Sequence, residues 1–554
     1  MDAPTSSGND IRSILVVGGG TAGYLTALAL RRDEPAIEVT LLESSRIPVI
    51  GVGEATTTLM PPFLHQRLGL DIVDFYREVR PTWKLGIRFE WGDPGTYAFN
   101  YPFGSTAALE AVAYDGILDN QSVASLMMNR CRAPLVGDAD GSPISLLPQM
   151  KLAYHLDNEP LVAFLARHAI AAGVRHVDAE VTDTVTSADG GSIEHLILAD
   201  GRELRADLYV DASGFRALLI EKALRSEFLS YASSLFCDSA IVGEVEQNEA
   251  IQPYTTAQTM DAGWCWRIPV EGADHRGYVY SSNHLDEEQA RDEMRAKNPT
   301  LRDVWSLRFR SGRHHEFWKG NTVAIGNAYG FVEPLQSTAI HMVILEIAYL
   351  LGGLRGMHTV QDPEDAAADR DFANQSMGAH WDFLRWFLAL HHKFNRKSES
   401  EFWRDCRHSV DVAGMQTLID RFTSDGPWHH DRDLHYAIGD PAFSFEGLML
   451  MMLGMKVPCP PASGVSVSQQ QWAARVADCR ALVDRALGQA EALAILRSHP
   501  ELLSEHADAP DSWINCGGEL ISRVDRQSGI VHPNPLRATE APPRPFQRLL
   551  APLE

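Results

Sequence analysis

The first fifty residues alternate between short apolar runs and polar or glycine-rich breaks. Residues 14–17 form an apolar, branched run whose length predicts a buried strand. Glycines follow at once, then a helical pattern over residues 25–32 and a second strand over residues 38–42. A strand, a glycine-rich turn, a helix and a second strand form the smallest β-α-β unit. The sequence therefore predicts a parallel sheet near the start of the chain.

Farther along the chain the pattern becomes mixed. Residues 239–282 alternate as in an antiparallel sheet, which predicts a second layer. After residue 363 the pattern is helical and rich in Trp, Phe and His. The other expected elements are helices over residues 61–78 and 155–172, strands over 86–91, 174–185, 207–210 and 321–325, a hairpin over 194–204, and a long helix from about residue 337. The predicted fold class is mixed α/β (α+β), a Rossmann-type module with an antiparallel sheet layer and a C-terminal helical region.

Composition and charge disfavour several classes of protein. The 554 residues are 45% hydrophobic and 22% charged, as in a globular protein, and the net charge of −24 disfavours nucleic acid as a partner. Seven scattered cysteines without a CxxC pair argue against a disulfide framework or a zinc site and fit a reducing compartment. Residues 1–12 are polar, and the apolar run 339–354 is too short and too polar to span a bilayer. We therefore expect a cytoplasmic protein without a membrane span or a bound metal.

A GxGxxG segment follows the first predicted strand. Its glycines allow a tight turn and a close approach of the backbone to a pyrophosphate, which then faces the N-terminus of the following helix. An acidic residue ends the second strand twenty residues after the last glycine and suits the hydroxyls of an adenosine ribose. The alternative is a glycine-rich turn without a ligand. The expected cofactor contacts are Gly18, Gly20, Thr21, Ala22, Gly23 and Glu43.

A second glycine turn suggests that the chain returns to the same cofactor. Gly326 and Asn327 follow the strand predicted over residues 321–325. Taken alone, this is equally well an ordinary turn between a strand and a helix. Two nucleotide-contacting segments far apart in one chain favour FAD over a simple NAD domain.

Five further segments resemble the motifs of flavin-dependent halogenases of the tryptophan halogenase family. They occur in the family's order and span roughly the first 340 residues, which is more specific than any one motif. The segments are GVGEAT at residues 51–56, PTWKLG at 81–86, DASGFR at 211–216, WCWRIP at 264–269 and FVEPLQST at 331–338. The resemblance implies an FAD-binding, monooxygenase-like module over residues 1–360, with an inserted sheet region at about 90–300, and a helical substrate-binding region over residues 361–554.

The resemblance also implies an activity. A separate NAD(P)H-dependent flavin reductase would supply FADH2, which with O2 oxidises chloride or bromide to hypohalous acid. This acid would travel through a tunnel to Lys84 and from there to a small electron-rich aromatic substrate, such as an indole or a phenol. A desolvated amine can form a haloamine, and an ammonium can polarise hypohalous acid by hydrogen bonding. Without its neighbours, Lys84 would be read as a solvated surface lysine.

Further site residues follow from the same resemblance. Trp264 and Trp266 would lie on one face of a strand, because they are two residues apart, and with Pro269 would form a tunnel wall. Thr338 and Ala339 would offer backbone N–H groups to a halide at a helix N-terminus. Core packing and an ordinary helix cap are the alternatives. The resemblance additionally assigns Gly53, Glu54, Ala55, Val181 and Ile340 to the flavin site and leaves a homodimer open.

The chain departs from the family pattern at the substrate end. Gln336 stands where tryptophan-specific members have a glutamate, and Ala339 stands where a glycine is usual. A glutamine can form hydrogen bonds but cannot act as a carboxylate base. A flavin-dependent hydroxylase and a catalytically weak FAD-binding protein therefore stay as alternatives. Paired histidines such as His391-His392 point in different directions and do not suggest a metal site. The candidates for an aromatic pocket are Trp381, Trp386, Phe387, Trp403, Trp428, Phe443 and Phe445.

Overall fold

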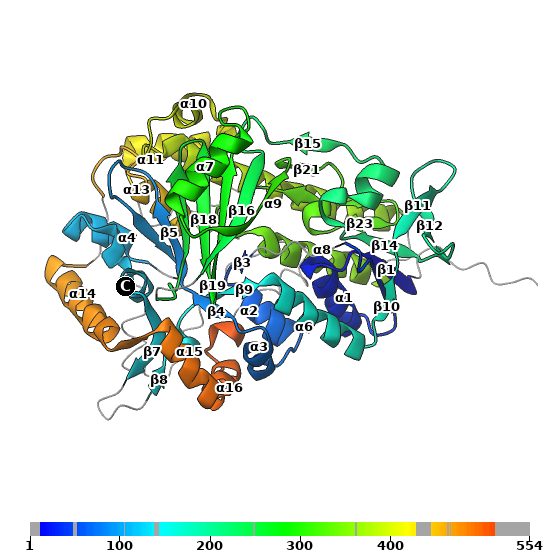
Figure 1. The fold of residues 1–554 in the computed structure, drawn as a ribbon, viewed down its shortest axis with the longest axis horizontal. Helices are drawn as coiled ribbons and strands as arrows, with labels where there is room; N and C mark the ends of the chain where they lie inside the picture. Colours follow the sequence, from blue (N-terminus) through cyan, green and yellow to red (C-terminus); the bar gives the residue numbers. More distant parts are fainter. Residues whose placement is uncertain are drawn as a thin grey trace, which may run out of the picture.

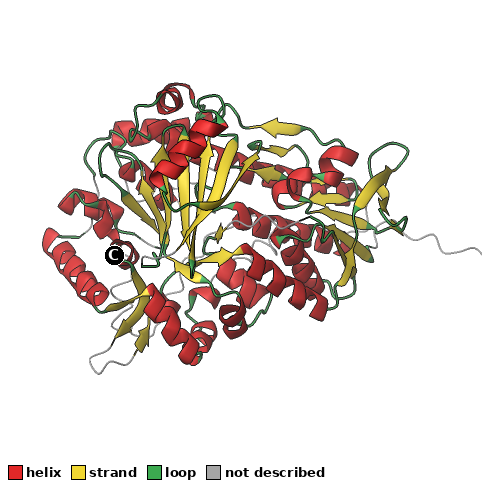
Figure 2. Ribbon diagram, viewed as in Figure 1, coloured by secondary structure: helices red, strands yellow, loops and turns green. Residues whose placement is uncertain are grey.

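Two large sheets joined by a small one form the centre of the molecule (Figure 1, Figure 2). The computed structural model describes residues 11–47, 53–104, 106–137, 143–246, 250–359, 363–427, 445–462, 465 and 467–515. In Figure 1 the parallel sheet lies at the right and the larger antiparallel sheet at the centre, and the small sheet lies between them. Helices pack against strands of all three sheets. No helix in these residues has the length and apolar character needed to cross a membrane.

The first sheet has six strands and confirms the predicted β-α-β unit. In spatial order its strands are β10 (Arg175–Asp178), β2 (Glu38–Glu43), β1 (Ser13–Val17), β14 (Leu208–Asp211), β23 (Thr322–Ala324) and β22 (Trp318–Lys319). All neighbours are parallel except the last pair. Strand β1 lies in the interior and is almost fully buried, as its apolar run predicts. Helices α1 (Thr21–Asp33), α6 (Asn158–Ala171) and α8 (Ala339–Thr359) pack together beside this sheet.

The second sheet has seven strands and confirms the antiparallel layer expected from residues 239–282. In spatial order its strands are β20 (Arg302–Arg308), β16 (Ser239–Glu246), β19 (Ala273–Tyr280), β18 (Gly263–Pro269), β17 (Thr255–Met260), β5 (Gly86–Glu90) and β6 (Phe99–Pro102). Strands β5 and β17 are parallel, and all other neighbours are antiparallel. Helix α7 (Glu287–Lys297) packs on one face.

The small sheet corrects one expectation. The helix predicted over residues 155–172 begins only at Asn158, because residues 153–157 form strand β9. Strand β9 pairs on one side with β3 (Gly53–Ala55) and on the other with β4 (Thr82–Lys84). Backbone hydrogen bonds to two neighbouring strands hold these residues extended, although their local sequence is compatible with a helix. This sheet therefore connects the segments at residues 53–56 and 82–84.

In the described residues, the C-terminal region is helical, as expected, with one exception. Its helices are α9 (Pro363–Phe394), α10 (Glu401–Ser409), α11 (Gln416–Asp425), α13 (Phe445–Gly454), α14 (Gln469–Asp484), α15 (Gln489–Ser498) and α16 (Glu501–Asp508). The exception is β25 (Ala486–Gly488), which pairs with β7 (Arg132–Gly137). Two side chains from this region also bind early segments: Gln489 Oε1 accepts the N–H of Trp83 at 2.5 Å, and Trp513 Nε1 donates to the carbonyl of Thr58 at 2.7 Å. The division at residue 360 stays a prediction.

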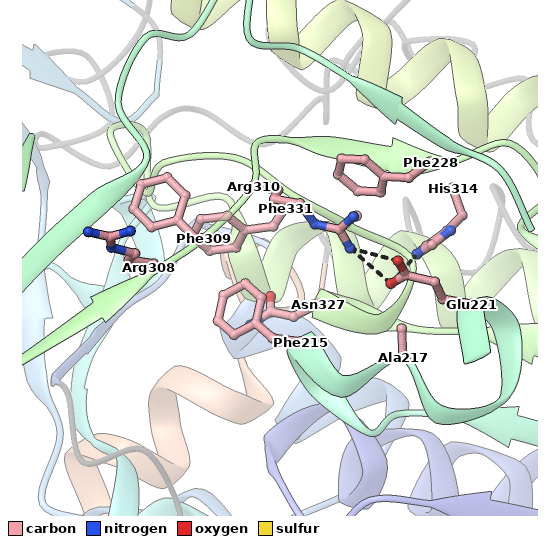
Figure 3. A pocket seen from close by; sticks show the side chains of 11 residues that line it. Phe215, Ala217, Glu221, Phe228, Arg308, Phe309, Arg310, His314, Asn327 and Phe331 are labelled. Atoms are coloured by element: carbon pink, nitrogen blue, oxygen red, sulfur yellow. Dashed lines mark hydrogen bonds and ion pairs between the residues drawn. The ribbon is translucent and has the colours of Figure 1, made fainter. Parts of the chain in front are cut away.

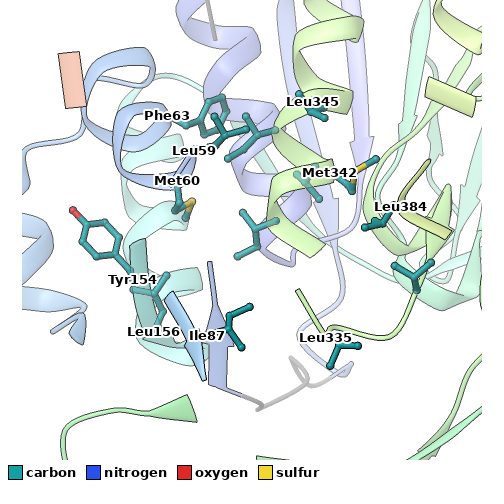
Figure 4. Packing of buried hydrophobic residues seen from close by; sticks show 14 of the residues in the cluster. Leu59, Met60, Phe63, Ile87, Tyr154, Leu156, Leu335, Met342, Leu345 and Leu384 are labelled. Carbon is teal, nitrogen blue, oxygen red and sulfur yellow. The ribbon is translucent and has the colours of Figure 1, made fainter. Parts of the chain in front are cut away.

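One hydrophobic core extends through most of the described chain and includes residues on both sides of position 360. Figure 4 shows the part where Leu59, Met60 and Phe63 lie between strand β9, which carries Tyr154 and Leu156, and helix α8. The remaining elements are α2 (Met60–Pro62), η1 (Phe63–Arg67), α3 (Ile72–Glu78), α4 (Ala108–Glu110), η2 (Ala111–Asp115), η3 (Leu118–Gln121), α5 (Val123–Arg130), β8 (Pro143–Ser145), η4 (Leu147–Gln149), β11 (Val181–Thr186), β12 (Ile193–Leu198), β13 (Glu203–Leu204), η5 (Gly214–Arg216), η6 (Leu218–Ala223), β15 (Phe228–Ser230), β21 (Gly312–His314), η7 (Gly326–Ala328), β24 (Gly330–Phe331) and η8 (Ala413–Met415).

Candidate functional site

The nucleotide motifs meet at one edge of the parallel sheet. Val17 pairs with Leu42 and with Asp211, and Asp211 pairs with Ala324. The GxGxxG, DASGFR and Gly326-Asn327 segments each follow the carboxyl end of one of these strands. In open α/β sheets, ligands bind at this edge. The register therefore brings together segments that are about three hundred residues apart in the sequence.

The glycines of the GxGxxG turn have two different tasks. Gly18 has a φ of +131°, and a Cβ there would lie 2.1 Å from the carbonyl oxygen of Ala212, so this glycine is needed for the fold itself. Gly20 precedes α1, and a Cβ there would meet no atom within 4 Å. No side chain caps α1, and its first turn has no acidic residue. An open approach to uncapped N–H groups fits the pyrophosphate of a dinucleotide.

Glu43 lies beside the same turn. Its Oε1 accepts hydrogen bonds from the Tyr24 hydroxyl and from His176 Nε2, both at 2.7 Å. A Cβ on Gly19 would lie 1.5 Å from its Oε2, so the carboxylate sits directly against the turn. The side chain is about one quarter exposed, with 26% relative accessibility. This position fits the contact with ribose hydroxyls expected from the sequence.

A buried glutamate that the sequence analysis missed holds the second glycine turn. Glu346 of α8 accepts the N–H of Gly326 at 2.6 Å on one oxygen and Nε1 of Trp381 at 3.1 Å on the other. Burial raises the pKa of Glu346 to about 8. Gly326 has a φ of +67°, and the next residue, Asn327, is exposed. Helices α8 and α9 thus hold this turn through Glu346 and Trp381.

A surface cavity of about 210 Å³ opens beside Asn327 (Figure 3). Phe215 of the DASGFR segment and Phe331 of the FVEPLQST segment both line it and pack edge to face against each other, with ring centroids 4.9 Å apart. On its other side Arg310 donates two hydrogen bonds to Glu221 at 2.9 and 3.0 Å. Residues from three separate motifs therefore gather around one hollow at the edge where the nucleotide motifs meet.

Lys84 is fully buried at the end of β4. Its Nζ donates to the carbonyl oxygen of Thr56 at 2.9 Å and lies 5.4 Å from the ring centre of Phe103. Burial holds the pKa of Lys84 well below its usual value. No charged partner offsets this burial among the residues that the structure describes. Lys84 is therefore not the solvated surface lysine that its sequence alone would suggest.

The segment that carries Thr56 connects Lys84 with the start of α8. Thr57 and His341 Nδ1 share a hydrogen bond of 2.9 Å, and His341 lies in the first turn of α8. At the other end of the segment, burial raises the pKa of Glu54 to about 7. A Cβ on Gly53 would lie 2.4 Å from the His275 ring of β19, so the segment passes close to the larger sheet. Residues 53–57 thus lie between the lysine, α8 and the tryptophan-bearing sheet.

Trp264 and Trp266 lie on one face of β18, as expected from their spacing. Their ring centroids are 6.1 Å apart and both side chains are buried. Trp264 Nε1 donates to Glu333 Oε2 at 2.5 Å, and the other oxygen of Glu333 accepts His392 Nε2 at 2.9 Å. At the end of the strand, the carbonyl of Pro269 accepts the hydroxyl of Thr82 at 2.7 Å. The tryptophan pair is thereby tied to α9 and to the strand of Lys84.

Gln336 forms a hydrogen bond that the sequence analysis did not anticipate. Its Nε2 lies 2.7 Å from Nε2 of His391, and both side chains are buried. Nδ1 of His391 lies 2.8 Å from the carbonyl oxygen of Phe387, and burial lowers the pKa of His391 to about 3. His391 and His392 thus reach different partners, as expected for adjacent residues. Fifty-five residues separate Gln336 from His391, so no local pattern links them.

Of the remaining residues expected to bind halide or flavin, three lie at the start of α8 and one lies in strand β11. Ser337 has a φ of +58°, Thr338 is buried, and Ala339 is the exposed first residue of α8. Ile340 is buried in the main core. Val181 is half-buried in β11, where it pairs with Leu198.

Four of the proposed pocket aromatics are buried or packed in the core, which agrees with the alternative of core packing. They are Trp381, Trp386, Phe387 and Trp403. Trp428, Phe443, the side chain of Phe445, and residues 51 and 52 of the GVGEAT segment lie outside the described residues.

Comparisons with known proteins agree with this arrangement. Residues 13–461 match the family model described as tryptophan halogenase. The chain is 32% identical over 526 residues to the 7-chloro-L-tryptophan 6-halogenase KtzR of Kutzneria sp. (strain 744), covering 89% of this chain and 99% of the relative. It is 32% identical to the tryptophan 7-halogenase RebH of Lentzea aerocolonigenes, covering 77% of this chain and 85% of that relative. Among solved structures, MibH, a lanthipeptide tryptophan 5-halogenase, superposes with a TM-score of 0.86 at 40% identity, covering 92% of this chain and 98% of that one.

Proposed function

Because the chain belongs to the tryptophan halogenase family of flavin-dependent halogenases, we propose that it chlorinates or brominates an indole ring with FADH2 and O2. The observation that carries this proposal is the fully buried Lys84 beside the flavin-type segment at residues 53–56, with no charged partner among the described residues. A buried amine without an acidic partner is costly for the fold and is expected where function requires it.

The flavin would bind at the edge where the nucleotide motifs meet. Gly20 and the uncapped start of α1 suit its pyrophosphate, and Glu43 suits its ribose. Gly326, held by Glu346, and the segment from Gly53 would lie along the rest of the cofactor. When bound and reduced by a separate reductase, FAD supplies the two electrons that, with O2, turn halide into hypohalous acid.

Lys84 would receive the oxidant. Because burial lowers its pKa, Lys84 gives up its proton more readily than a solvated lysine, and the neutral amine can attack the halogen to form a haloamine. If it stays protonated, it can donate a hydrogen bond to hypohalous acid and so polarise the O–X bond. In both cases its strand fixes the amine at one place in the interior.

The tryptophan pair would keep the aromatic substrate away from the flavin. Trp264 is anchored by Glu333, so its ring cannot easily swing aside. The halide would bind at the N–H groups of Thr338 and Ala339, where α8 begins. This arrangement separates the formation of the oxidant from its use.

The relatives suggest the ring that is halogenated. KtzR is named for 7-chloro-L-tryptophan, RebH for tryptophan, and MibH for tryptophan in a lanthipeptide. All three carry an indole. The higher identity to MibH makes a tryptophan side chain within a peptide the first substrate to test, followed by the free amino acid.

The test is a reconstituted reaction with a flavin reductase, NADH, FAD, bromide and tryptophan-containing peptides, analysed by mass spectrometry. We expect a product that is heavier by one bromine less one hydrogen. Lys84→Met should lose this product and retain FAD binding, whereas Lys222→Met, at an exposed position, should retain both. A hydroxylated product, or equal bromination by the Lys84→Met protein, would contradict the proposal.

A further inference from the structure

Gln336, His391 and the carbonyl of Phe387 form a buried chain of hydrogen bonds with a fixed direction. A carbonyl oxygen can only accept, so the ring proton of His391 must be on Nδ1, 2.8 Å from Phe387. Nε2 of the neutral imidazole then carries a lone pair and can only accept. The group that faces it at 2.7 Å must be the amide NH2 of Gln336.

The surroundings keep this imidazole neutral. Burial is the main reason that its pKa is about 3, and the neighbouring His392 lowers it further. The rings of Phe89 and Phe387 lie 5.5 and 4.8 Å from the His391 ring, and Met451 Sδ lies 3.8 Å from Gln336 Nε2. None of these apolar groups can stabilise a charge on the imidazole.

We infer that His391 acts as a positioning residue that turns the Gln336 amide so that its carbonyl oxygen is the acceptor offered to an N–H or O–H of the aromatic substrate. The oxygen and nitrogen of an amide point about 120° apart, so binding of the NH2 by His391 directs the oxygen elsewhere. This inference rests on the proposed function for the identity of the ligand, but not for the geometry of the pair.

The hydrogen-bonded pair Gln336–His391 stands where the family has a carboxylate, and His391 suits an amide at position 336. A glutamate at position 336 would direct a negative oxygen at the lone pair of Nε2, and one additional proton would have to be bound between the two groups. The histidine therefore accounts for the departure from the family motif: a neutral amide and a neutral imidazole satisfy each other where an anion would not.

The substitution reaction does not require a carboxylate for its overall balance. In Ar–H + HOX → Ar–X + H2O, the C–H and O–X bonds break, and the C–X and O–H bonds form. The ring carbon loses two electrons to the halogen, and the displaced proton ends on the hydroxide of HOX. A neutral acceptor still assists, because an indole N–H becomes a stronger donor as the ring gains positive charge. The substrate class is thus an aromatic ring with an N–H or O–H group.

The decisive experiment measures binding and does not depend on turnover. We would determine the dissociation constants of indole and N-methylindole with the FAD-loaded protein, because only indole has the N–H donor. Wild type should prefer indole by about tenfold, the worth of one hydrogen bond of roughly 1.4 kcal/mol. His391→Phe keeps a ring but removes the acceptor, so the two ligands should then bind with about equal dissociation constants. His391→Gln, whose carbonyl can accept the same NH2, should restore part of it.

The outcomes separate this inference from the proposed function. A preference that survives in His391→Phe, or that is absent in wild type, would overturn the role of the pair. FAD affinity and circular dichroism that match wild type would show that the variant is folded. In turnover with a reductase and bromide, His391→Phe should slow bromination of indole about tenfold without changing the yield of hypobromous acid trapped by an added phenol. A wild type that binds indole with the expected preference but brominates nothing would refute only the proposed function.

Discussion

Lys84→Met should make the protein more stable while removing its activity. The thioether side chain fills nearly the same space as the lysine but has no charge to desolvate. In the unfolded chain a lysine titrates near 10.4, whereas burial holds the pKa of Lys84 well below this value in the folded protein. Between these two pKa values the unfolded chain binds one more proton than the folded protein.

The magnitude follows from this difference in bound protons. Where the unfolded state binds one more proton, stability rises with pH by about 1.4 kcal/mol per pH unit. Over the pH range just below 10.4, which lies between the two pKa values, the stability of wild type should therefore rise with pH relative to that of the Lys84→Met protein, at up to about 1.4 kcal/mol per pH unit. Above pH 8, His155, whose pKa is also depressed by burial and by Lys84, is neutral in both states and adds no difference.

The assay is urea unfolding of both proteins, without added flavin, at several pH values across this window. The difference between the two unfolding free energies removes all other titrating groups, which the proteins share. Lys222→Met, at an exposed position, should leave the slope unchanged. If wild type and Lys84→Met gave parallel curves over the whole window, Lys84 would be in contact with water and the argument for a desolvated amine would be refuted.

Three further predictions use other parts of the site. Gly20→Ala should fold normally, since its Cβ meets no atom, and should lose FAD in a binding titration; Gly18→Ala should instead fail to fold stably. Glu333→Gln should lower the unfolding free energy by about 1–3 kcal/mol in urea, and adding Trp264→Phe should cost less than the sum of the single changes, because they share one hydrogen bond. Burial raises the pKa of Glu54 to about 7, so its contribution to stability is lost as pH rises through 7. Between pH 5 and 8, the unfolding free energy of Glu54→Gln should therefore rise by about 1–2 kcal/mol relative to that of wild type. This is less than the full linkage value because the side chain is partly exposed.

Local patterns were enough to predict the parallel sheet. The strand at residues 13–17, the glycine turn and α1 follow from apolar runs and glycines that are adjacent in the sequence. The antiparallel layer and the face shared by Trp264 and Trp266 follow from a period of two, which is also local. The helical character of the C-terminal region required only composition and periodicity.

The polar contacts of the site could not be predicted in this way. Lys84 is buried by Thr56 and by strands distant in sequence, while the lysine taken without its neighbours suggests a surface position. The partner of Gln336 lies 55 positions away, on helix α9. The strand at residues 153–157 has helix-compatible residues and is extended only because β3 and β4 flank it. In each case the deciding interaction joins residues that are too far apart in the sequence to belong to one local pattern.

The hydrogen bond that Gln489 accepts from Trp83 and the one that Trp513 donates to Thr58 have a consequence for biosynthesis. The ribosome adds these two side chains after nearly the whole N-terminal portion has emerged, so the segments around positions 58 and 83 are left without their final partners for most of translation. Nascent chains arrested before residue 489 should consequently be cut by protease near these segments. A fusion partner attached shortly after residue 515 is poorly placed, because it would crowd the hydrogen bond of Trp513, which is the last of the two to form.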